Sequence, residues 1–180
     1  MTDRKTDYLK TEPLRIAQAQ MPVITDPAAC RDYLETAAEK AAGQKAQFLL
    51  LPEMFCCPYD TASFPEYAEE EGGPVYTLCS ELARKYGIYF SAGTIPERDS
   101  RDRIYNTAYV FDPEGRQIAK HRKMHLFDIQ VQGGQHFRES DVLSAGNSVT
   151  VFDTVFGTFG LGVCFDISFP DLFRLMALKG

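Results

Sequence analysis

The stretch Gly157–Asp171, GTFGLGVCFDISFPD, predicts a strand, a sharp turn and a helix in direct succession. Large apolar residues alternate with Gly160 and Gly162 in its first half, which is typical of a buried strand that another group can approach closely. The predicted strand ends at Cys164. We therefore expect this cysteine between the end of a strand and the N-terminus of a helix.

The helix is expected to begin with a capping motif. Ser168 and Asp171 have the S-x-x-D spacing of a helix N-terminus, and Pro170 suits the first turn. Unpaired backbone N–H groups at such an end favour a thiolate, which makes Cys164 a candidate nucleophile. A buried cysteine that serves as a small hydrophobic residue explains this stretch equally well.

The composition indicates one globular domain that does not bind nucleic acid or a membrane. The 180 residues are 44% hydrophobic and 24% charged, which is ordinary for a domain with a hydrophobic core. A net charge of −6 and a pI near 5.1 argue against nucleic acid or an anionic membrane as partner. No apolar run is long enough for a membrane span, and the polar first residues do not read as a secretory signal.

The cysteines are odd in number and contain no C-x-x-C pair, so neither a disulfide framework nor a structural zinc site is expected. Free thiols suit a reducing cytoplasm. We expect no metal and no organic cofactor. The residues concerned are Cys30, Cys56, Cys57, Cys79 and Cys164, with the histidines His121, His125 and His136.

The rest of the chain alternates helices and strands, which predicts an α/β layered domain with a mixed sheet. Residues 1–12 are expected to be a tail and residues 13–180 one domain. The expected elements are helices at 27–43 and 74–86, strands at 14–21, 48–51 and 88–92, a charged turn at 97–103, hairpins at 105–122 and 149–164, and an irregular stretch at 124–144.

Glu53 and Lys123, like Cys164, fall at or just beyond predicted strand ends, where sites in such sheets usually lie. A thiol needs a base, and the oxygen of an attacked carbonyl needs a positive or donating partner. Glu53 follows an apolar strand, so burial would raise its pKa and suit it to act as the base. A histidine base remains open, as do a surface role for Glu53 and a basic cluster around Lys123.

Three motifs taken together resemble the nitrilase superfamily, the carbon–nitrogen hydrolases. They are LLLPEMF at 49–55, HRKMHLFD at 121–128 and GLGVCFDISFPDL at 160–172, and the resemblance covers nearly all of residues 14–180. The segment KMHLFD and the later F-x-E-S-D-x-L-S-A-G-N-S at 137–148 look most like the omega-amidase branch.

The resemblance implies an α/β fold, a four-layer αββα sandwich with mixed sheets, and a role for each site residue. Glu53 is the implied general base, Lys123 the group that stabilises the oxyanion, and Cys164 the nucleophile. Glu139, in the segment FRES, matches a second glutamate that hydrogen-bonds the lysine. The backbone N–H of Phe165 is implied to complete the oxyanion hole.

The implied activity is hydrolysis of a small amide with release of ammonia, through a thioester on the cysteine. The resemblance also implies a homodimer or higher homo-oligomer, and the composition already argues against nucleic acid or a membrane as partner. The alternative is an inactive or truncated family member that acts as a structural or binding protein. A hydrolase with a cysteine–histidine pair is the third reading.

Two departures from the family pattern accompany the resemblance. Many members have arginine where this chain has Ser168, and arginine can hold a substrate carboxylate in a bidentate pair. We expect Ser168 to cap the helix instead. Family domains also run well past 180 residues, so we expect the C-terminal part of the sandwich to be missing.

Overall fold

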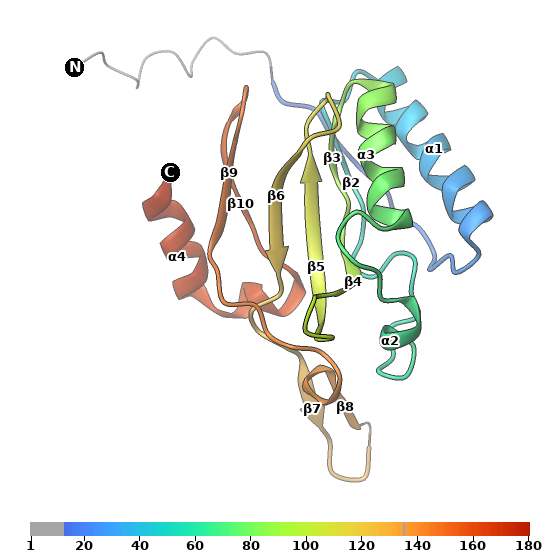
Figure 1. Cartoon of the computed structure of the whole chain (residues 1–180). Coiled ribbons are helices and arrows are strands. Elements are labelled where there is room, and N and C mark those ends of the chain that lie inside the picture. Colours follow the sequence, from blue (N-terminus) through green and yellow to red (C-terminus); the bar gives the residue numbers. More distant parts are fainter. Residues whose placement is uncertain (1–12, 135) are drawn as a thin grey trace.

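A computed structural model of the protein describes residues 13–134 and 136–180, which form four layers (Figure 1). Helices α1 (Pro27–Gly43) and α3 (Pro74–Tyr86) cover one face of a mixed sheet. A hairpin faces the other side of that sheet, and helix α4 (Pro170–Lys179) packs on the hairpin. The α/β sandwich predicted from the sequence is confirmed, whereas the predicted tail at 1–12 lies outside the described residues.

In the described part of the chain, six strands form the main sheet, in the order β1-β2-β3-β5-β4 with β6 beside β5. The first three strands are parallel, and β5 pairs antiparallel with β3, β4 and β6. The strands are β1 Ile16–Gln18, β2 Phe48–Leu50, β3 Tyr89–Ser91, β4 Ile95–Arg98, β5 Ile104–Phe111 and β6 Gln117–Arg122.

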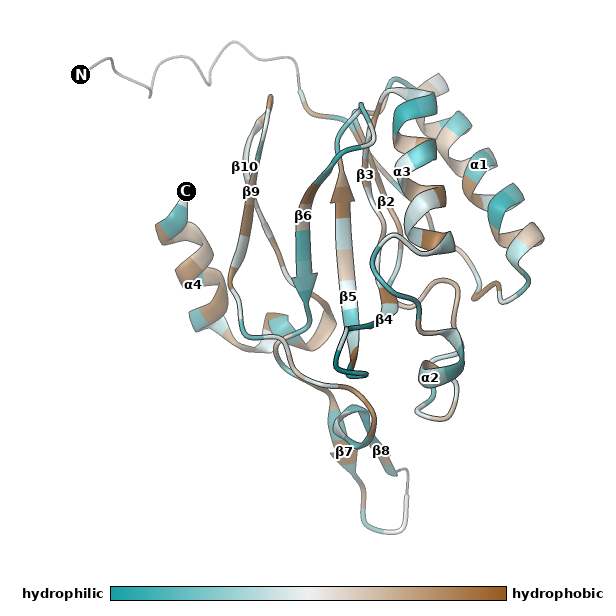
Figure 2. Ribbon diagram, in the orientation of Figure 1, coloured by the Kyte–Doolittle hydropathy of each residue, from teal (hydrophilic) through white to brown (hydrophobic). Residues whose placement is uncertain are grey.

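Both long helices begin and end where the sequence predicts. The Asp26 side chain caps α1 by accepting from the Ala29 N–H at 2.8 Å, and Gly87, with a φ of 63°, ends α3 in the left-handed conformation. Teal and brown patches alternate along both helices in Figure 2, as expected of helices with one buried face. The buried face of α1 consists of Cys30, Leu34, Ala38 and Ala41.

A hydrophobic core lies between the main sheet and the hairpin of β9 (Thr150–Thr154) and β10 (Gly157–Leu161). Phe48 stacks on Tyr89 with ring centroids 4.6 Å apart, and Phe159 packs against Phe48 at 5.3 Å. Such aromatic pairs contribute about 1 kcal/mol each beyond the apolar area that they bury.

Gly160 in β10 and Gly162 just after it let helix α4 approach the hairpin, as their alternation in the sequence predicted. A Cβ added at Gly160 would lie 2.8 Å from the sulfur of Met176, and one at Gly162 would lie 3.2 Å from the Phe173 ring. Met176 and Leu172 are the residues through which α4 is buried. A side chain at Gly160 would push the helix away from the strands.

Two predicted loops contain regular structure. The stretch expected to be irregular at 124–144 includes the hairpin of β7 (Asp128–Gln130) and β8 (His136–Arg138). These strands have three residues each, and each contributes one apolar side chain, Ile129 or Phe137, so their alternation is too short to recognise in the sequence.

The predicted charged turn at 97–103 begins too early. The prediction is wrong for residues 97 and 98, because strand β4 continues through Arg98. Glu97 is buried in this strand and pairs with Lys120 at 2.5 Å and with Arg122 at 2.6 Å. Glu97 also accepts a hydrogen bond from Thr107. A buried carboxylate is tolerated in a strand when it is paired in this way.

Truncating a buried leucine of α1 should weaken the fold far more than the same change on the outer face of α4. Leu34 is 0% exposed and Leu178 is 73% exposed. Leu34→Ala is expected to lower the free energy of unfolding by about 2–5 kcal/mol through lost burial and a residual cavity. Leu178→Ala should change it by no more than about 0.5 kcal/mol. Urea titration followed by circular dichroism measures both, and equal effects would contradict the burial assigned to α1.

Candidate active site

The sequence-predicted site residues come together at one end of the two sheets. Glu53 follows β2, Lys123 follows β6 and Cys164 follows β10. Glu139 begins the short 3₁₀ turn after β8. Because these strands end at the same edge of the sandwich, residues 70 and 41 positions apart in the chain can share one site.

Lys123 is the centre of this group and is 0% exposed. Its Nζ lies 3.1 Å from Glu53 Oε1 and 3.0 Å from Glu139 Oε1. Burial acts to lower the pKa of Lys123, but the two carboxylates outweigh it and hold the pKa above its ordinary value of 10.5. The lysine is therefore a fixed ammonium between two carboxylates.

Tyr59 and Asn106 complete the group, and sequence reasoning did not single them out. The Tyr59 hydroxyl lies within hydrogen-bonding distance of Glu139, Glu53 and Lys123. The amide of Asn106 donates to Glu53 Oε1 at 2.6 Å. The signal for Tyr59 is the irregular stretch, rich in aromatic residues, that follows Glu53 in the sequence. The signal for Asn106 is an amide in an otherwise largely apolar strand, IYNTAYVF.

Cys164 is exposed, and its backbone has a φ of 46°. This left-handed conformation costs a residue with a side chain about 1–2 kcal/mol, so the surrounding contacts must hold it. Burial raises the pKa of the Cys164 thiol above its ordinary value of 9.0, the adjacent Glu53 carboxylate raises it further, and Lys123 offsets only part of this. The expectation that a helix end favours a thiolate is therefore wrong, because burial of the sulfur and then the adjacent Glu53 carboxylate raise the thiol pKa.

The Asp166 carboxylate ties the cysteine turn to the lysine segment. Its Oδ2 accepts from the backbone N–H of Val163 at 3.0 Å and lies 3.1 Å from His121 Nε2. Its Oδ1 accepts from the backbone N–H groups of Met124 and His125, and lies 2.7 Å from His125 Nδ1. Cys164 lies two residues before Asp166 in the chain, and Lys123 lies between His121 and His125. The histidines thus bind Asp166, which disfavours the cysteine–histidine reading.

Hydrogen bonds to Asp166 also set its charge. Burial acts to raise the pKa of this carboxyl, but donors from His121, Val163 and His125 outweigh it and hold the pKa at about 2. Sequence reasoning missed Asp166. The signal was an acidic residue two positions after the cysteine, together with a histidine on either side of the lysine motif.

An open pocket of about 490 Å³ lies in front of Cys164. A second hollow, of about 370 Å³, reaches Glu53 and Cys164 from between the sheets. Phe165 lines the open pocket, and its ring packs edge-on against Phe127 with centroids 5.2 Å apart. The open pocket is lined by Glu53, Tyr59, Phe127, Cys164, Phe165, Ile167 and Ser168.

Ser168 lines this pocket and does not cap helix α4. The residue that precedes the helix is Phe169, and no side chain caps the helix there. The predicted cap is wrong because residues 164–168 form a separate 3₁₀ turn, which moves the start of α4 beyond Ser168.

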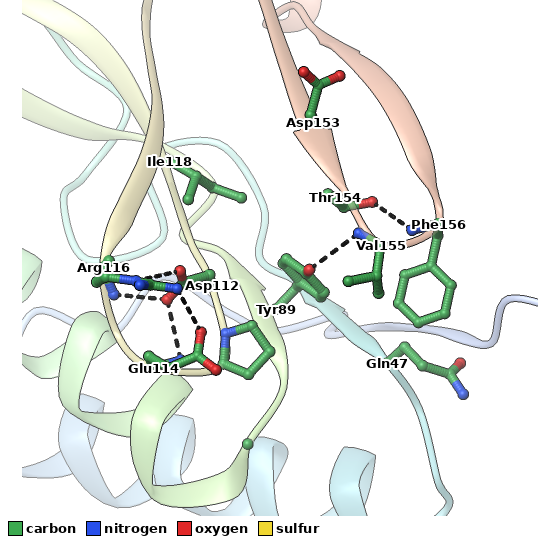
Figure 3. A pocket seen from close by; sticks show the side chains of 12 residues that line it. Gln47, Tyr89, Asp112, Glu114, Arg116, Ile118, Asp153, Thr154, Val155 and Phe156 are labelled. Carbon is green, nitrogen blue, oxygen red and sulfur yellow. Dashed lines mark hydrogen bonds and ion pairs between the residues drawn. The ribbon is translucent and has the colours of Figure 1, made fainter.

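Another hollow, of about 610 Å³, lies at the opposite end of the strands, between the β5–β6 turn and the β9–β10 turn (Figure 3). Arg116 is paired there with Asp112 and Glu114, and the residues that line the hollow include no cysteine or histidine.

Within the described residues, no three His, Cys, Asp or Glu side chains gather as metal ligands. None of the described helices is both long and apolar enough to cross a membrane.

Comparisons with known proteins show which family the chain resembles. The model of the carbon–nitrogen hydrolase family matches residues 15–180. A hydrolase of Schizosaccharomyces pombe is 49% identical over 143 residues, which are 78% of this chain and 44% of that protein. Omega-amidase NIT2 of Danio rerio is 43% identical over 166 residues, which are 92% of this chain and 60% of that protein.

Solved structures give the same result. The crystal structure of Saccharomyces cerevisiae Nit3, a member of branch 10 of the nitrilase superfamily, matches with a TM-score of 0.80 and 36% identity. The match covers 92% of this chain and 60% of Nit3. The chain thus spans about half the length of the curated relatives that it matches.

Removing the charge of Asp166 should destabilise the fold. Asp166→Asn is expected to lower the free energy of unfolding at neutral pH by about 3–5 kcal/mol, because buried donors lose a charged acceptor. The depressed pKa of Asp166 means that its contribution is present above about pH 4 and is lost as the pH falls towards 2. The difference in the free energy of unfolding between wild type and variant should therefore become smaller over that pH range.

Urea titrations at a series of pH values measure this gap. Asp32→Asn, the same change on the exposed side of α1, is the control and should shift stability by no more than about 0.5 kcal/mol. A gap that stays constant down to pH 2 would show that the carboxylate charge of Asp166 is not what stabilises the fold.

Glu53→Gln should make Cys164 more reactive towards iodoacetamide. Removing the carboxylate removes a group that raises the thiol pKa, and each half unit of lowered pKa increases the thiolate fraction about threefold. Peptide mapping after alkylation at pH 8 measures the rate at Cys164, since the other four cysteines are buried. Glu39→Gln, on an exposed position, is the control. A slower reaction in Glu53→Gln would contradict the assigned electrostatics.

Proposed function

The chain belongs to the carbon–nitrogen hydrolase family, and we propose that it hydrolyses small amides through a thioester on Cys164. The observation that carries the proposal is an open pocket lined by the Glu53 carboxylate and the accessible Cys164 thiol, with the buried Lys123 ammonium paired to Glu53. Each of these groups comes from a different part of the chain. The chain spans about half the length of its curated relatives, so this activity is a proposal for the chain itself.

In the first half of the reaction, Glu53 accepts the proton of the Cys164 thiol as the sulfur attacks the amide carbonyl. The pKa of the thiol is raised, so the resting site holds a thiol beside a carboxylate, and transfer of one proton generates the nucleophile. The carbonyl oxygen becomes an oxyanion. The Lys123 ammonium and the backbone N–H of Phe165 are the groups proposed to stabilise it.

The tetrahedral intermediate then collapses. Glu53 returns its proton to the nitrogen, the carbon–nitrogen bond breaks, and ammonia leaves the acyl group on the sulfur. In the second half, Glu53 takes a proton from water, the hydroxyl attacks the thioester, and the carboxylic acid departs as the thiol is restored. Each proton taken by Glu53 is returned within the same half of the reaction.

Glu139 is proposed to hold Lys123 and not to exchange protons. It is 0% exposed, pairs with Lys123, and accepts from the backbone N–H of Phe127 at 2.6 Å. These contacts use both of its oxygens. Lys123 thereby keeps its charge and position while Glu53 changes its own charge during the reaction.

The omega-amidase branch predicted from the sequence is part of this proposal, supported by the relative of that name in Danio rerio. A cytoplasmic location and a homodimer or higher homo-oligomer belong to it as well. All five cysteines of the described chain are free thiols, which suits a reducing compartment. Exposed apolar side chains on α4, at Phe173, Leu175 and Leu178, offer a surface for self-association.

An acyl adduct on Cys164 tests the proposal. The full chain is incubated with a panel of small primary amides, quenched in acid and analysed by intact-protein mass spectrometry, with ammonia release measured in parallel. Wild type should gain the mass of the acyl group. Cys164→Ala should gain none, and Glu53→Gln should acylate at least about 100-fold more slowly, because a general base contributes about 10²–10⁴ in rate.

Cys79→Ala is the matched control, since it removes a buried thiol far from the pocket and should leave the adduct intact. If folded wild-type protein forms no adduct and releases no ammonia with any amide of the panel, the alternative holds. The chain would then be a structural or binding protein that retains the family's side chains.

A further inference from the structure

The two oxygens of the Glu53 carboxylate have different surroundings. Oε1 accepts from the Asn106 amide at 2.6 Å, and lies 3.1 Å from the Lys123 ammonium and 3.3 Å from the Tyr59 hydroxyl. Within the described residues, the hydrogen bonds to the Glu53 side chain all end on Oε1. The side chain is 21% exposed and lines the open pocket beside Cys164. Oε2 is therefore the oxygen with lone pairs open to a proton.

Asn106 is fixed within the main sheet. It is 0% exposed and belongs to β5, whose residues are all buried. It pairs with Pro96 of β4 on one side, and its carbonyl accepts from the Lys123 N–H at 2.8 Å on the other. One residue thus holds the backbone of the lysine through its carbonyl and the carboxylate of Glu53 through its amide.

The amide of Asn106 is not explained by the packing of the core. Its Nδ2 has Glu53 as partner, whereas its Oδ1 is buried and has no hydrogen-bond partner within the described residues. A buried acceptor without a partner costs stability, which an apolar side chain in this largely apolar strand would not. The opposite orientation of the amide would set Oδ1 against Glu53 Oε1, two acceptors face to face. The contact with Glu53 therefore accounts for an amide at this position.

We propose that Asn106 is a positioning residue for the general base: its amide holds Glu53 Oε1, so that Oε2 is the oxygen that takes the proton of Cys164. The proposal rests on the function proposed above for the reaction itself. As the S–H bond breaks, its electron pair stays on the sulfur and the proton forms an O–H bond with Oε2. The same oxygen returns the proton to the nitrogen that leaves. Asn106 is not among the residues that line the two hollows at Cys164, so it acts through Glu53.

Alkylation of Cys164 by iodoacetamide tests this hold on Glu53 without requiring catalysis. Asn106→Leu keeps the branched skeleton without a donor, and Asn106→Ala guards against crowding in the core. A carboxylate that is no longer held swings away from the sulfur for part of the time and raises the thiol pKa less. Variants that circular dichroism shows to be folded should therefore react at least about twofold faster than wild type at pH 8. An unchanged or slower rate overturns the proposal.

A double-mutant cycle shows whether this effect passes through Glu53. Added to Glu53→Gln, Asn106→Leu or Asn106→Ala should change the alkylation rate by no more than about 1.3-fold, since the charge that Asn106 positions is already gone. The same acceleration with and without the Glu53 carboxylate overturns the proposal.

Thr107→Val is the matched control for a general loosening of the strand. Thr107 follows Asn106 in β5, is also 0% exposed, and donates to Glu97 at 2.7 Å. Loss of this hydrogen bond should lower the urea midpoint while Cys164 reacts at the wild-type rate. An acceleration in Thr107→Val equal to that of the Asn106 variants overturns the proposal.

Acylation by the small amides of the panel then separates this proposal from the proposed function. Acylation of wild type supports both proposals if the Asn106 variants react at least about tenfold more slowly at saturating amide, with an unchanged half-saturating concentration, because a displaced base loses rate and not binding. Acylation of the Asn106 variants at the wild-type rate overturns the positioning and leaves the hydrolase intact. Coupling in the alkylation cycle without acylation of wild type by any amide supports the hold of Asn106 on Glu53 and removes the hydrolase.

Discussion

The geometry of the site depends on one buried carboxylate, that of Asp166. It accepts hydrogen bonds from the turn that contains the cysteine and from the segment that contains the lysine. The hydrogen bond from the Val163 N–H to Asp166, and the reverse one from the Asp166 N–H to the Val163 carbonyl, close the chain around Cys164. This closure explains how a cysteine is held in the left-handed conformation, which would otherwise relax.

The hydrogen bonds that Asp166 accepts from the lysine segment also explain the position of Lys123. The main sheet fixes Lys123 from one side, where its N–H donates to the carbonyl of Asn106 at 2.8 Å. Asp166 fixes the two residues that follow it. The ammonium of Lys123 lies between Glu53 and Glu139. An ammonium between two carboxylates keeps its charge when one of them is protonated, so Glu53 can exchange a proton without loss of the positive centre.

The sequence predicts the chemical residues better than it predicts their supports. Glu53, Lys123 and Cys164 are recognisable because each lies just beyond the end of a strand and belongs to a motif. Both long helices are equally plain, since their caps and apolar spacing are local features. Asp166 and Asn106 are different, because their roles depend on partners about 40–50 residues away that no local pattern indicates.

Other errors have the same origin. Glu97 reads as part of a charged turn because its neighbours are polar, yet distant Lys120 and Arg122 allow it to be buried in a strand. The cysteine reads as an activated thiolate because the local chain resembles a helix start. The pKa of the Cys164 thiol is instead raised, first by burial and then by Glu53, which is 111 positions away in the chain. Electrostatic environments are set by tertiary contacts, which a linear pattern does not contain.

The side chains of the short turn at 164–168 point in two directions, some into the protein interior and others towards the open pocket. Asp166 points into the protein and is fully buried, whereas Phe165, Ile167 and Ser168 line the open pocket. A substitution at Ile167 or Ser168 therefore alters the pocket wall without touching the contacts that hold the cysteine. Phe127 has the corresponding position in the lysine segment, since its side chain lines the pocket while its N–H binds Glu139. In both segments, buried contacts hold the backbone beside Lys123 or Cys164, and the side chains that line the pocket take no part in those contacts.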